Sequence, residues 1–354
     1  MALSQFRATG FRCLEATEFE PHPRLTCLSG ANASGKTSVL EAIFYLGRGR
    51  SFRAGSNREL LQEGAEQFAL FGRIDAGADT HRAGVEVEPG QRRVRVDGEN
   101  AAAADLARVL PVQAIDPEIH NLVQGGPEFR RRFLDWGVFH VKHEFLGVWQ
   151  RYQTALKQRN AALRQGFTAR SIRSFEEEVI TAGEHVARLR ADYFSDYMQF
   201  LSPIVDDFLP FAVKCSYLRG WPEGASLLEA LEQTWDGDQA RGTTHRGPHR
   251  AELKLEVQSR RARYRVSRGQ QKLLAAAMII AQVRQLAAAM SGNLVLLVDD
   301  PSAELDPDNR RRLFALLADV PAQLFVAALD PADLPVGDDC LRLDIEHGRL
   351  ATLV

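Results

Sequence analysis

Apolar and polar positions divide the chain into three blocks. From Phe6 to about Gln113, short apolar runs alternate with Gly, Asp and Pro, a pattern that predicts strands with one helix. From about Glu128 to Gln239 the apolar residues recur at three- and four-residue spacing, which predicts helices. From Leu253 onward strand-like runs return. The pattern therefore predicts mixed α/β blocks at both ends of the chain and a helical block between them.

Two apolar stripes stand out in the middle block. The first runs from Phe145 to Leu163 and the second from Ile172 to Tyr193, both with helical spacing. Gly166 lies in the short polar break between them, so we expect an antiparallel pair of helices whose stripes pack as core.

The first chemical motif is a glycine-rich loop between a predicted strand and a predicted helix. The strand is the apolar run Leu25 to Leu28, and the helix is Ser38 to Leu46. Backbone N–H groups of such a loop close around phosphate oxygens, and the helix N-terminus adds partial positive charge. The pattern GxxxxGK[ST] predicts ATP or GTP binding, with Lys36 on the β- and γ-phosphates and the Thr37 hydroxyl on Mg²⁺. The motif comprises Gly30, Ala31, Asn32, Ala33, Ser34, Gly35, Lys36 and Thr37.

A fully apolar run ends in an acidic pair near the other end of the chain. Leu294 to Val298 predict a buried parallel strand that delivers Asp299 and Asp300 to its carboxyl end. We expect Asp299 to hold the hydration shell of Mg²⁺ and Asp300 to be the general base that polarises the attacking water.

The separation of these motifs indicates how the domain is built. A kinase or small GTPase would place its second motif much earlier, so the ATPase sheet must combine both ends of the chain. We expect residues 1–113 and 244–354 to form this head, and residues 114–243 to form an inserted helical lobe. Two further pieces follow the same order: Ser267-Arg268-Gly269-Gln270 before a long apolar helix, and Ser302-Ala303-Glu304-Leu305-Asp306 after the acidic pair.

Composition narrows the functional classes. The 354 residues carry a formal net charge of −2, so any DNA contact must be a local patch. Four cysteines without a CxxC pair suit a reducing compartment. The first ten residues lack an apolar signal core, and the longest apolar run, Leu273 to Ala281, is short for a membrane span. We expect a soluble, cytoplasmic protein.

Glycine loop, SxGQ-type signature, apolar strand with acidic pair and SxELD loop, in this order, resemble an ABC-type P-loop ATPase head. The closest variety is that of chromosome-maintenance and DNA-repair proteins, and within it the chain resembles the bacterial RecF family. The likeness spans nearly the whole chain. The segments that carry it in the middle of the chain are Gly125-Gly126-Pro127, Arg131-Arg132-Phe133-Leu134-Asp135-Trp136, Leu156-Lys157-Gln158-Arg159-Asn160 and Gly247-Pro248-His249-Arg250.

The resemblance implies an ATP-gated dimer that works on DNA. In such heads the signature loop closes over ATP held by a second subunit, a role that fits Ser267, Gly269 and Gln270. RecF-like proteins load onto duplex beside single-stranded gaps and, with RecR and RecO, help to place the recombinase. Hydrolysis then releases the dimer, as in a switch.

Two departures from the ABC pattern predict slow hydrolysis. The general base of ABC-type heads is usually Glu, whereas this chain has Asp300 at that position. Glu304 is a second candidate for the base. Many such heads carry a switch histidine after the next strand; here Asp330 stands instead, and an acid there would repel the γ-phosphate.

Several basic residues have candidate roles. Related heads have a basic residue near the adenine or phosphates where this chain has Arg12, although an exposed strand arginine is an equal alternative. Gln113 and Asp116 fit a γ-phosphate-sensing loop. Candidate DNA contacts, each also readable as a solvated helix face, are Arg48, Arg50, Arg53, Arg130, Arg131 and Arg132.

Two other functional classes share part of this chemistry. The ATPase subunit of a membrane transporter has the same head, but normally a switch histidine and a short helical insert. A nucleotide kinase would need an acceptor site and a lid, and neither is recognisable here. The sequence favours the DNA-binding dimer.

Overall fold

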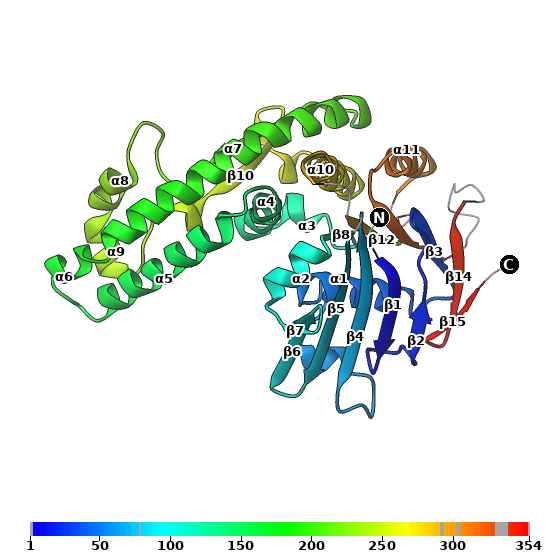
Figure 1. The fold of residues 1–354 in the computed structure, drawn as a ribbon. Helices are drawn as coiled ribbons and strands as arrows, with labels where there is room; N and C mark the ends of the chain where they lie inside the picture. The colour runs from blue at the N-terminus through cyan, green and yellow to red at the C-terminus, as the bar shows by residue number, and fades with distance from the viewer. Residues whose placement is uncertain (1–2, 78, 291–293, 302–304, 330–338, 353–354) are drawn as a thin grey trace. The chain divides into compact units, whose positions relative to one another are not determined.

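The computed structural model describes residues 3–77, 79–290, 294–301, 305–329 and 339–352 (Figure 1). They form two compact units: residues up to Ile119 with those from Ala275 onward, and His120–Leu274. The fold is an α/β head assembled from both ends of the chain, with a largely helical unit inserted. The second boundary lies later than the expected 243/244, because β10 (Glu252–Val257) pairs with β9 (Val213–Leu218) and so stays in the second unit.

The first unit contains a sheet whose strands come from both ends of the chain. Its order is β15-β14-β3-β13-β12-β8, and every pairing is parallel except that of β14 with β15. All five residues of β12 and of β13 are buried, as expected of strands covered on both faces. Parallel strands bring their carboxyl ends to one edge, where the predicted nucleotide-binding residues lie. The bounds are β3 Leu25–Ser29, β8 Val112–Ile115, β12 Val295–Asp299, β13 Gln323–Ala327, β14 Leu341–Glu346 and β15 Arg349–Thr352.

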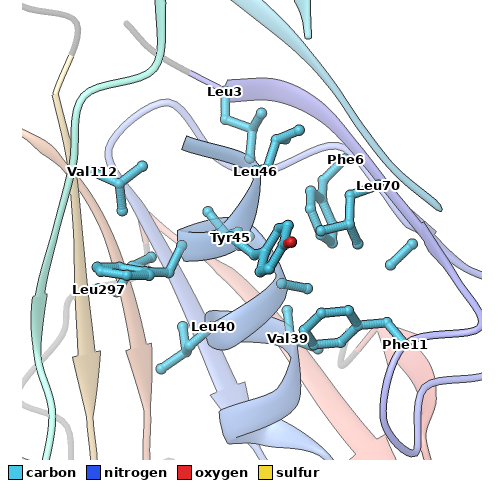
Figure 2. Close-up of a cluster of buried hydrophobic side chains, with 14 of the residues drawn as sticks. Leu3, Phe6, Phe11, Val39, Leu40, Tyr45, Leu46, Leu70, Val112 and Leu297 are labelled. Atoms are coloured by element: carbon cyan, nitrogen blue, oxygen red, sulfur yellow. The ribbon is translucent and has the colours of Figure 1, made fainter. Parts of the chain in front are cut away.

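A second, antiparallel sheet of the same unit has the order β2-β1-β4-β5-β6-β7. Helix α1 (Lys36–Arg48) is buried along Val39–Gly47, and a helix buried all round is typical of a domain core. Figure 2 shows its side chains packed between Leu297 and Val112 of one sheet and Phe6 and Leu70 of the other. The strands are β1 Leu3–Thr9, β2 Thr17–Phe19, β4 Phe68–Ala76, β5 Asp79–Glu88, β6 Gln91–Val96 and β7 Glu99–Asn100, and the other helices of this unit are η1 Asn57–Leu60, α2 Ala103–Val109 and α11 Pro307–Ala318.

Helix α10 (Arg268–Ala289) leads the chain from the second unit back into the first. It is longer than the apolar run from which it was predicted. By length and composition it is the one helix of the described residues that could cross a membrane, with a mean hydropathy of 1.3. In the protein 78% of this apolar window is buried, as in the core helix of a folded domain.

The second unit is built on two long antiparallel helices, α5 (Phe145–Arg164) and α7 (Glu176–Phe208), as the apolar stripes predicted. A short helix, α6 (Ala169–Arg173), interrupts the second stripe. A three-stranded sheet of order β11-β10-β9 completes the unit. Its remaining elements are α3 Asn121–Gln124, α4 Pro127–Val141, α8 Leu227–Gln233, α9 Trp235–Arg241, η2 Pro248–Arg250, β11 Arg260–Arg261 and η3 Ala262–Tyr264.

Thr244 links the segments Leu156–Asn160 and Gly247–Arg250 inside this unit, because both are hydrogen-bonded to it. The fully buried guanidinium of Arg159 donates to Glu176 at 3.1 Å, to Asp238 at 2.9 Å and to the Thr244 hydroxyl at 2.8 Å. Two buried carboxylates and a hydroxyl thus satisfy a buried charge that would otherwise be costly.

A buried histidine continues this network. His249 Nε2 lies 3.0 Å from the carbonyl oxygen of Thr244, and Nδ1 lies 2.5 Å from the hydroxyl of Tyr152. A carbonyl can only accept, so Nε2 carries the proton and Nδ1 accepts from Tyr152. Burial lowers the pKa of His249 to about 4, which keeps the ring neutral in this tautomer. The histidine therefore links α5 to the turn before β10.

Candidate nucleotide site and basic surfaces

The glycine loop begins at the carboxyl end of β3 and ends at the first residue of α1. Gly30, Ala33 and Gly35 have φ angles of 136°, 62° and 121°. A side chain at Gly30 would lie 2.4 Å from the carbonyl oxygen of Ile345 on β14, so only glycine fits there. The buried Ser34 hydroxyl has no hydrogen-bond partner among the described residues. An orphaned donor in a loop of this shape fits a phosphate ligand.

Strand β14 and the turn that follows it form a wall behind the loop. The N–H of Gly348 donates to the Ser34 carbonyl at 2.8 Å, and the Gly348 carbonyl accepts from Glu15 at 3.2 Å. A side chain at Gly348 would lie 1.9 Å from the Cys13 carbonyl oxygen. The shape of the phosphate loop therefore depends on backbone contacts with the C-terminal strands.

Lys36 lies along its own loop. Its Nζ donates to the carbonyl oxygens of Gly30 at 2.6 Å and Ala31 at 2.8 Å. Partial burial lowers the pKa of Lys36, while the carboxylates of Asp299, Asp300 and others oppose that shift. The ammonium is thus held at the loop in a field of negative charge.

Thr37 and Asp299 meet although they lie 262 positions apart in the chain. The threonine hydroxyl is 3.0 Å from each oxygen of the carboxylate. Burial raises the pKa of Asp299, and the neighbouring charge of Asp300 raises it further. A buried carboxylate of this kind is stabilised by a nearby cation.

These two residues fit Mg²⁺. A hydroxyl and a carboxylate supply the hard oxygen ligands that Mg²⁺ prefers. The described residues contain no cluster of three His, Cys, Asp or Glu side chains that could hold a metal. Mg²⁺ needs none when water and phosphate oxygens fill most of its coordination sphere.

Asp300 is exposed and has a left-handed backbone, with φ of 47°. Its N–H donates to the carbonyl of Ala327 on β13 at 3.0 Å, which fixes this conformation at the end of the sheet. The alternative base, Glu304, and Asp330, which stands where many such heads have a switch histidine, lie outside the described residues.

Asp116 and Arg53 add to the site at the same edge of the sheet. Ile115 pairs with Val298, so the next residues along, Asp116 and Asp299, are neighbours. Burial raises the pKa of Asp116 to about 6, and the charge of Asp299 contributes to the rise. The Arg53 guanidinium lowers the pKa of both carboxyl groups. Arg53 thus lies beside the acidic end of the nucleotide site, and its assignment to DNA stays a prediction.

Arg12 and Arg48 are held by protein groups. Arg12 forms a two-pronged ion pair with buried Glu41, at 2.9 and 3.0 Å, and donates to the Glu59 carbonyl. Arg48 donates to the Val112 carbonyl at 3.0 Å and to Gln113 at 3.1 Å. These bonds direct both guanidinium groups to the protein. The DNA contact of Arg48 is therefore corrected to a structural role, whereas the nucleotide contact of Arg12, whose side chain is 27% exposed, stays a prediction.

Arg50 and the Arg130–Arg132 triplet differ in exposure. Arg50 and Arg132 are exposed, so their assignment to DNA stays a prediction. Arg130 is buried, bonded to Glu252 at 2.8 and 3.1 Å and to the Gly125 carbonyl, and Arg131 donates to the Ala251 carbonyl. The DNA contact of Arg130 is therefore corrected to a structural role. Arg131 is half-buried and bonded to one backbone carbonyl, and its DNA contact stays a prediction.

The signature segment is also a capping box at the start of α10. The Ser267 hydroxyl accepts the N–H of Gln270 at 3.3 Å, and Gln270 Oε1 accepts the N–H of Ser267 at 3.0 Å. Gly269 lies inside the first turn. The hydroxyl proton of Ser267 takes no part in this reciprocal pair, so it remains a donor suited to an anion.

The run of arginines before this signature escaped the sequence analysis. Arg260, Arg261, Arg263, Arg265 and Arg268 fall within nine residues and surround Tyr264, which is 70% exposed. Basic residues interleaved with an aromatic side chain would have been the signal.

Comparison with known proteins identifies the family. The family model described as the RecF/RecN/SMC N-terminal domain matches residues 2–351. The chain is 38% identical over 335 residues to the DNA replication and repair protein RecF of Shewanella baltica, covering 94% of this chain and 93% of the relative. It is 40% identical over 363 residues to the protein of that name from Pseudomonas syringae pv. tomato, covering 99% and 98%.

Solved structures agree on the fold. A structure of the recombination mediator protein RecF with ATP has a TM-score of 0.89 and 22% identity, covering 100% of this chain and 98% of the other. The Smc head domain of Pyrococcus furiosus bound to the C-terminal domain of ScpA has a TM-score of 0.62 and 15% identity, covering 100% and 96%. With the sequence relatives, these findings show that the chain belongs to the RecF family of DNA replication and repair proteins.

Proposed function

We propose that this chain is an ATP-dependent DNA-binding protein of recombinational repair and replication restart. It dimerises on ATP, binds DNA at single-strand gaps and junctions, and helps to load a recombinase; slow hydrolysis releases it. The observation that carries the proposal is the meeting of Thr37 and Asp299 beside Lys36, in a chain of the RecF family.

Each group at the loop has a defined task toward the nucleotide. Backbone N–H groups of the loop and the Ser34 hydroxyl bind phosphate oxygens, and Lys36 exchanges its two carbonyl acceptors for the β- and γ-phosphates. Thr37 and Asp299 would hold Mg²⁺, which would neutralise phosphate charge and favour attack at the γ-phosphorus. Asp300 accepts a proton from the attacking water.

Hydrolysis by this site is weak, as suits a switch. Asp300 is one methylene shorter than the usual glutamate base, and its carboxylate therefore reaches less far. The sequence after β13, from Ala328 to Asp339, contains no histidine that could contact the γ-phosphate. A slow step lets the ATP-bound state persist while DNA is engaged.

Dimerisation follows from the signature segment. Ser267 offers a hydroxyl, and α10 offers its N-terminus, to the γ-phosphate of ATP held by a second copy. ATP then joins two copies, and its loss separates them.

The relatives support the proposed partners. A solved relative is described as a recombination mediator protein in the RecFOR pathway, so RecR and RecO are proposed partners beside DNA, and the proposed location is the cytoplasm. The matched family is that of the RecF/RecN/SMC N-terminal domain, which does not support the alternative of a transporter subunit.

The test is the nucleotide dependence of assembly and of DNA binding. Light scattering should show a dimer with ATP and a monomer with ADP or without nucleotide. Fluorescence anisotropy with a gapped duplex should show tight binding only under the dimerising condition, and Lys36→Met is the matched control. DNA affinity that is equal with and without ATP would contradict the proposal.

A further inference from the structure

The arginine run before the signature forms a tight hairpin, residues 257–265, called here the arginine hairpin. Strand β10 turns back into β11 through Gln258 and Ser259, with Val257 paired to Arg260. Both turn residues have positive φ, 50° and 61°, as a two-residue type I′ turn requires. Neither is glycine or asparagine, so the turn is held at a conformational cost.

Positive charge on this hairpin is not neutralised by the protein. Arg260, Arg261 and Arg265 are exposed, and no carboxylate among the described residues forms an ion pair with them. Glu256 pairs with Arg261 in the strand register, but its carboxylate binds Lys254 at 2.7 Å. In a chain with a net charge of −2, such a cluster is a local site for an anionic partner.

Tyr264 gives the surface an aromatic platform. Its side chain is 70% exposed, and the guanidinium of Arg263 lies 4.5 Å from the ring centroid. A tyrosine placed for core packing would be buried, as Tyr193 and Tyr197 are in the same unit. An exposed ring with a guanidinium over it, among exposed arginines that form no ion pair with a described carboxylate, is the arrangement that binds unpaired bases.

The hairpin is tied to the start of helix α10. Ala262 and Val266 anchor it in the interior, and buried Gln271 donates to the carbonyls of Val266 at 3.2 Å and Arg263 at 3.5 Å. Ser267 follows at once. A ligand on the hairpin therefore acts on the same backbone that places the signature serine.

We propose that the arginine hairpin binds DNA, with Arg260, Arg261 and Arg265 on backbone phosphates and Tyr264 stacked on an unpaired base. The inference rests on the proposed function and assigns its DNA contact. Phosphates are common to duplex and single strands, whereas an unpaired base is present only at a gap or junction. The tyrosine thus selects gapped DNA, and the arginines supply affinity for any DNA.

Two variants separate these tasks. With ATP, Arg260→Gln/Arg261→Gln should weaken binding to gapped and intact duplex alike and make the slope of log K against log salt shallower by about 2. Tyr264→Ala should weaken binding to gapped DNA alone, by about 5- to 150-fold, and Tyr264→Phe should retain it. The matched control is Arg164→Gln/Arg170→Gln. This variant removes two exposed arginines of the same unit, one at the end of α5 and one in α6.

The outcomes distinguish this proposal from the function on which it rests. Wild-type protein that binds no DNA with ATP would overturn both. Wild-type binding that the hairpin variants retain in full, or lose only as much as the control, would overturn the hairpin proposal alone. Variants that keep DNA affinity but lose binding to an acidic protein would show a protein-docking surface instead. ATP affinity by calorimetry should be unchanged in all variants, since none alters the glycine loop.

Discussion

The ammonium of Lys36 bonds to two carbonyls of its own loop, and phosphate oxygens should replace them. Lys36→Met should therefore lower ATP affinity by roughly 10- to 150-fold, the loss expected for one charged hydrogen-bonding group. Calorimetric titration with Mg-ATP measures this, and an unchanged unfolding temperature shows that the fold is intact. Equal affinities in variant and wild type would remove Lys36 from the site.

Asp300 and Asp299 should respond differently to the loss of charge. Asp300→Asn cannot accept a proton from water, so kcat should fall by about 10²- to 10⁴-fold while ATP binding and dimerisation persist. Asp299→Asn should instead lower the affinity for Mg²⁺, so that hydrolysis requires a higher Mg²⁺ concentration. Steady-state phosphate release at several Mg²⁺ concentrations measures both effects. Glu304→Gln is measured in the same assay because Glu304 is the alternative base. Normal turnover by Asp300→Asn with none by Glu304→Gln would identify the other base.

Asp116 makes a prediction about pH. Its pKa is about 6 in the folded protein and 3.8 is the ordinary value, so the folded state holds its proton more tightly. This stabilisation is complete below pH 3.8 and is lost as pH rises through 6. Without nucleotide and Mg²⁺, the free energy of unfolding of Asp116→Asn should exceed that of wild type by up to about 3 kcal/mol at pH 7. Near pH 4 the two proteins should be equally stable. Urea titrations at each pH test this; a constant difference would contradict it.

Among the structural elements, the junction of α5 with the turn before β10 has the opposite pH response. The pKa of His249 falls from 6.5 to about 4 in the folded protein, so protonation favours unfolding. Its contribution to stability is complete above pH 6.5 and is lost as pH falls toward 4. His249→Gln should make the free energy of unfolding depend less on pH between pH 4 and 6.5. His143→Gln, a substitution of an exposed histidine, should leave this dependence as in wild type. An identical acid response in both variants would exclude the ring.

Elements with a strong local signal were predicted well. The strand expected at Leu25–Leu28 is β3, the helix expected at Ser38–Leu46 lies within α1, and the paired apolar stripes became α5 and α7. Each depends on the spacing of neighbouring residues, which a sequence displays directly. The capping box at Ser267 and the arginine hairpin were equally local signals, and they were missed.

Features that depend on distant residues could not be predicted in this way. The burial of Arg130 requires Glu252, 122 positions away, and the ion pair of Arg12 requires Glu41 on another element. Basic triplets resemble one another in sequence whether their partners are phosphates or carboxylates. The position of Arg53 beside Asp116 likewise follows from the order of strands in the sheet, which no local pattern specifies.

At the scale of the whole molecule, the signature is expected to act on ATP held by the other copy. Lys36→Met and Ser267→Arg should each abolish hydrolysis alone. Mixing them should restore up to about a quarter of wild-type activity, since half of the random dimers contain one site with both residues intact. Phosphate release from the mixture measures this. A mixture as inactive as its components would show that each copy uses its own signature.

The wall behind the phosphate loop has a consequence for how the protein is made. Gly30 and Ser34 leave the ribosome early, but Ile345, Gly348 and Asp299, which shape and complete the site, are translated much later. A nascent chain that already contains the whole glycine motif therefore still lacks the contacts that shape it. We therefore expect competence to bind ATP to arise late in translation, so that incomplete chains stay outside the proposed nucleotide-driven cycle.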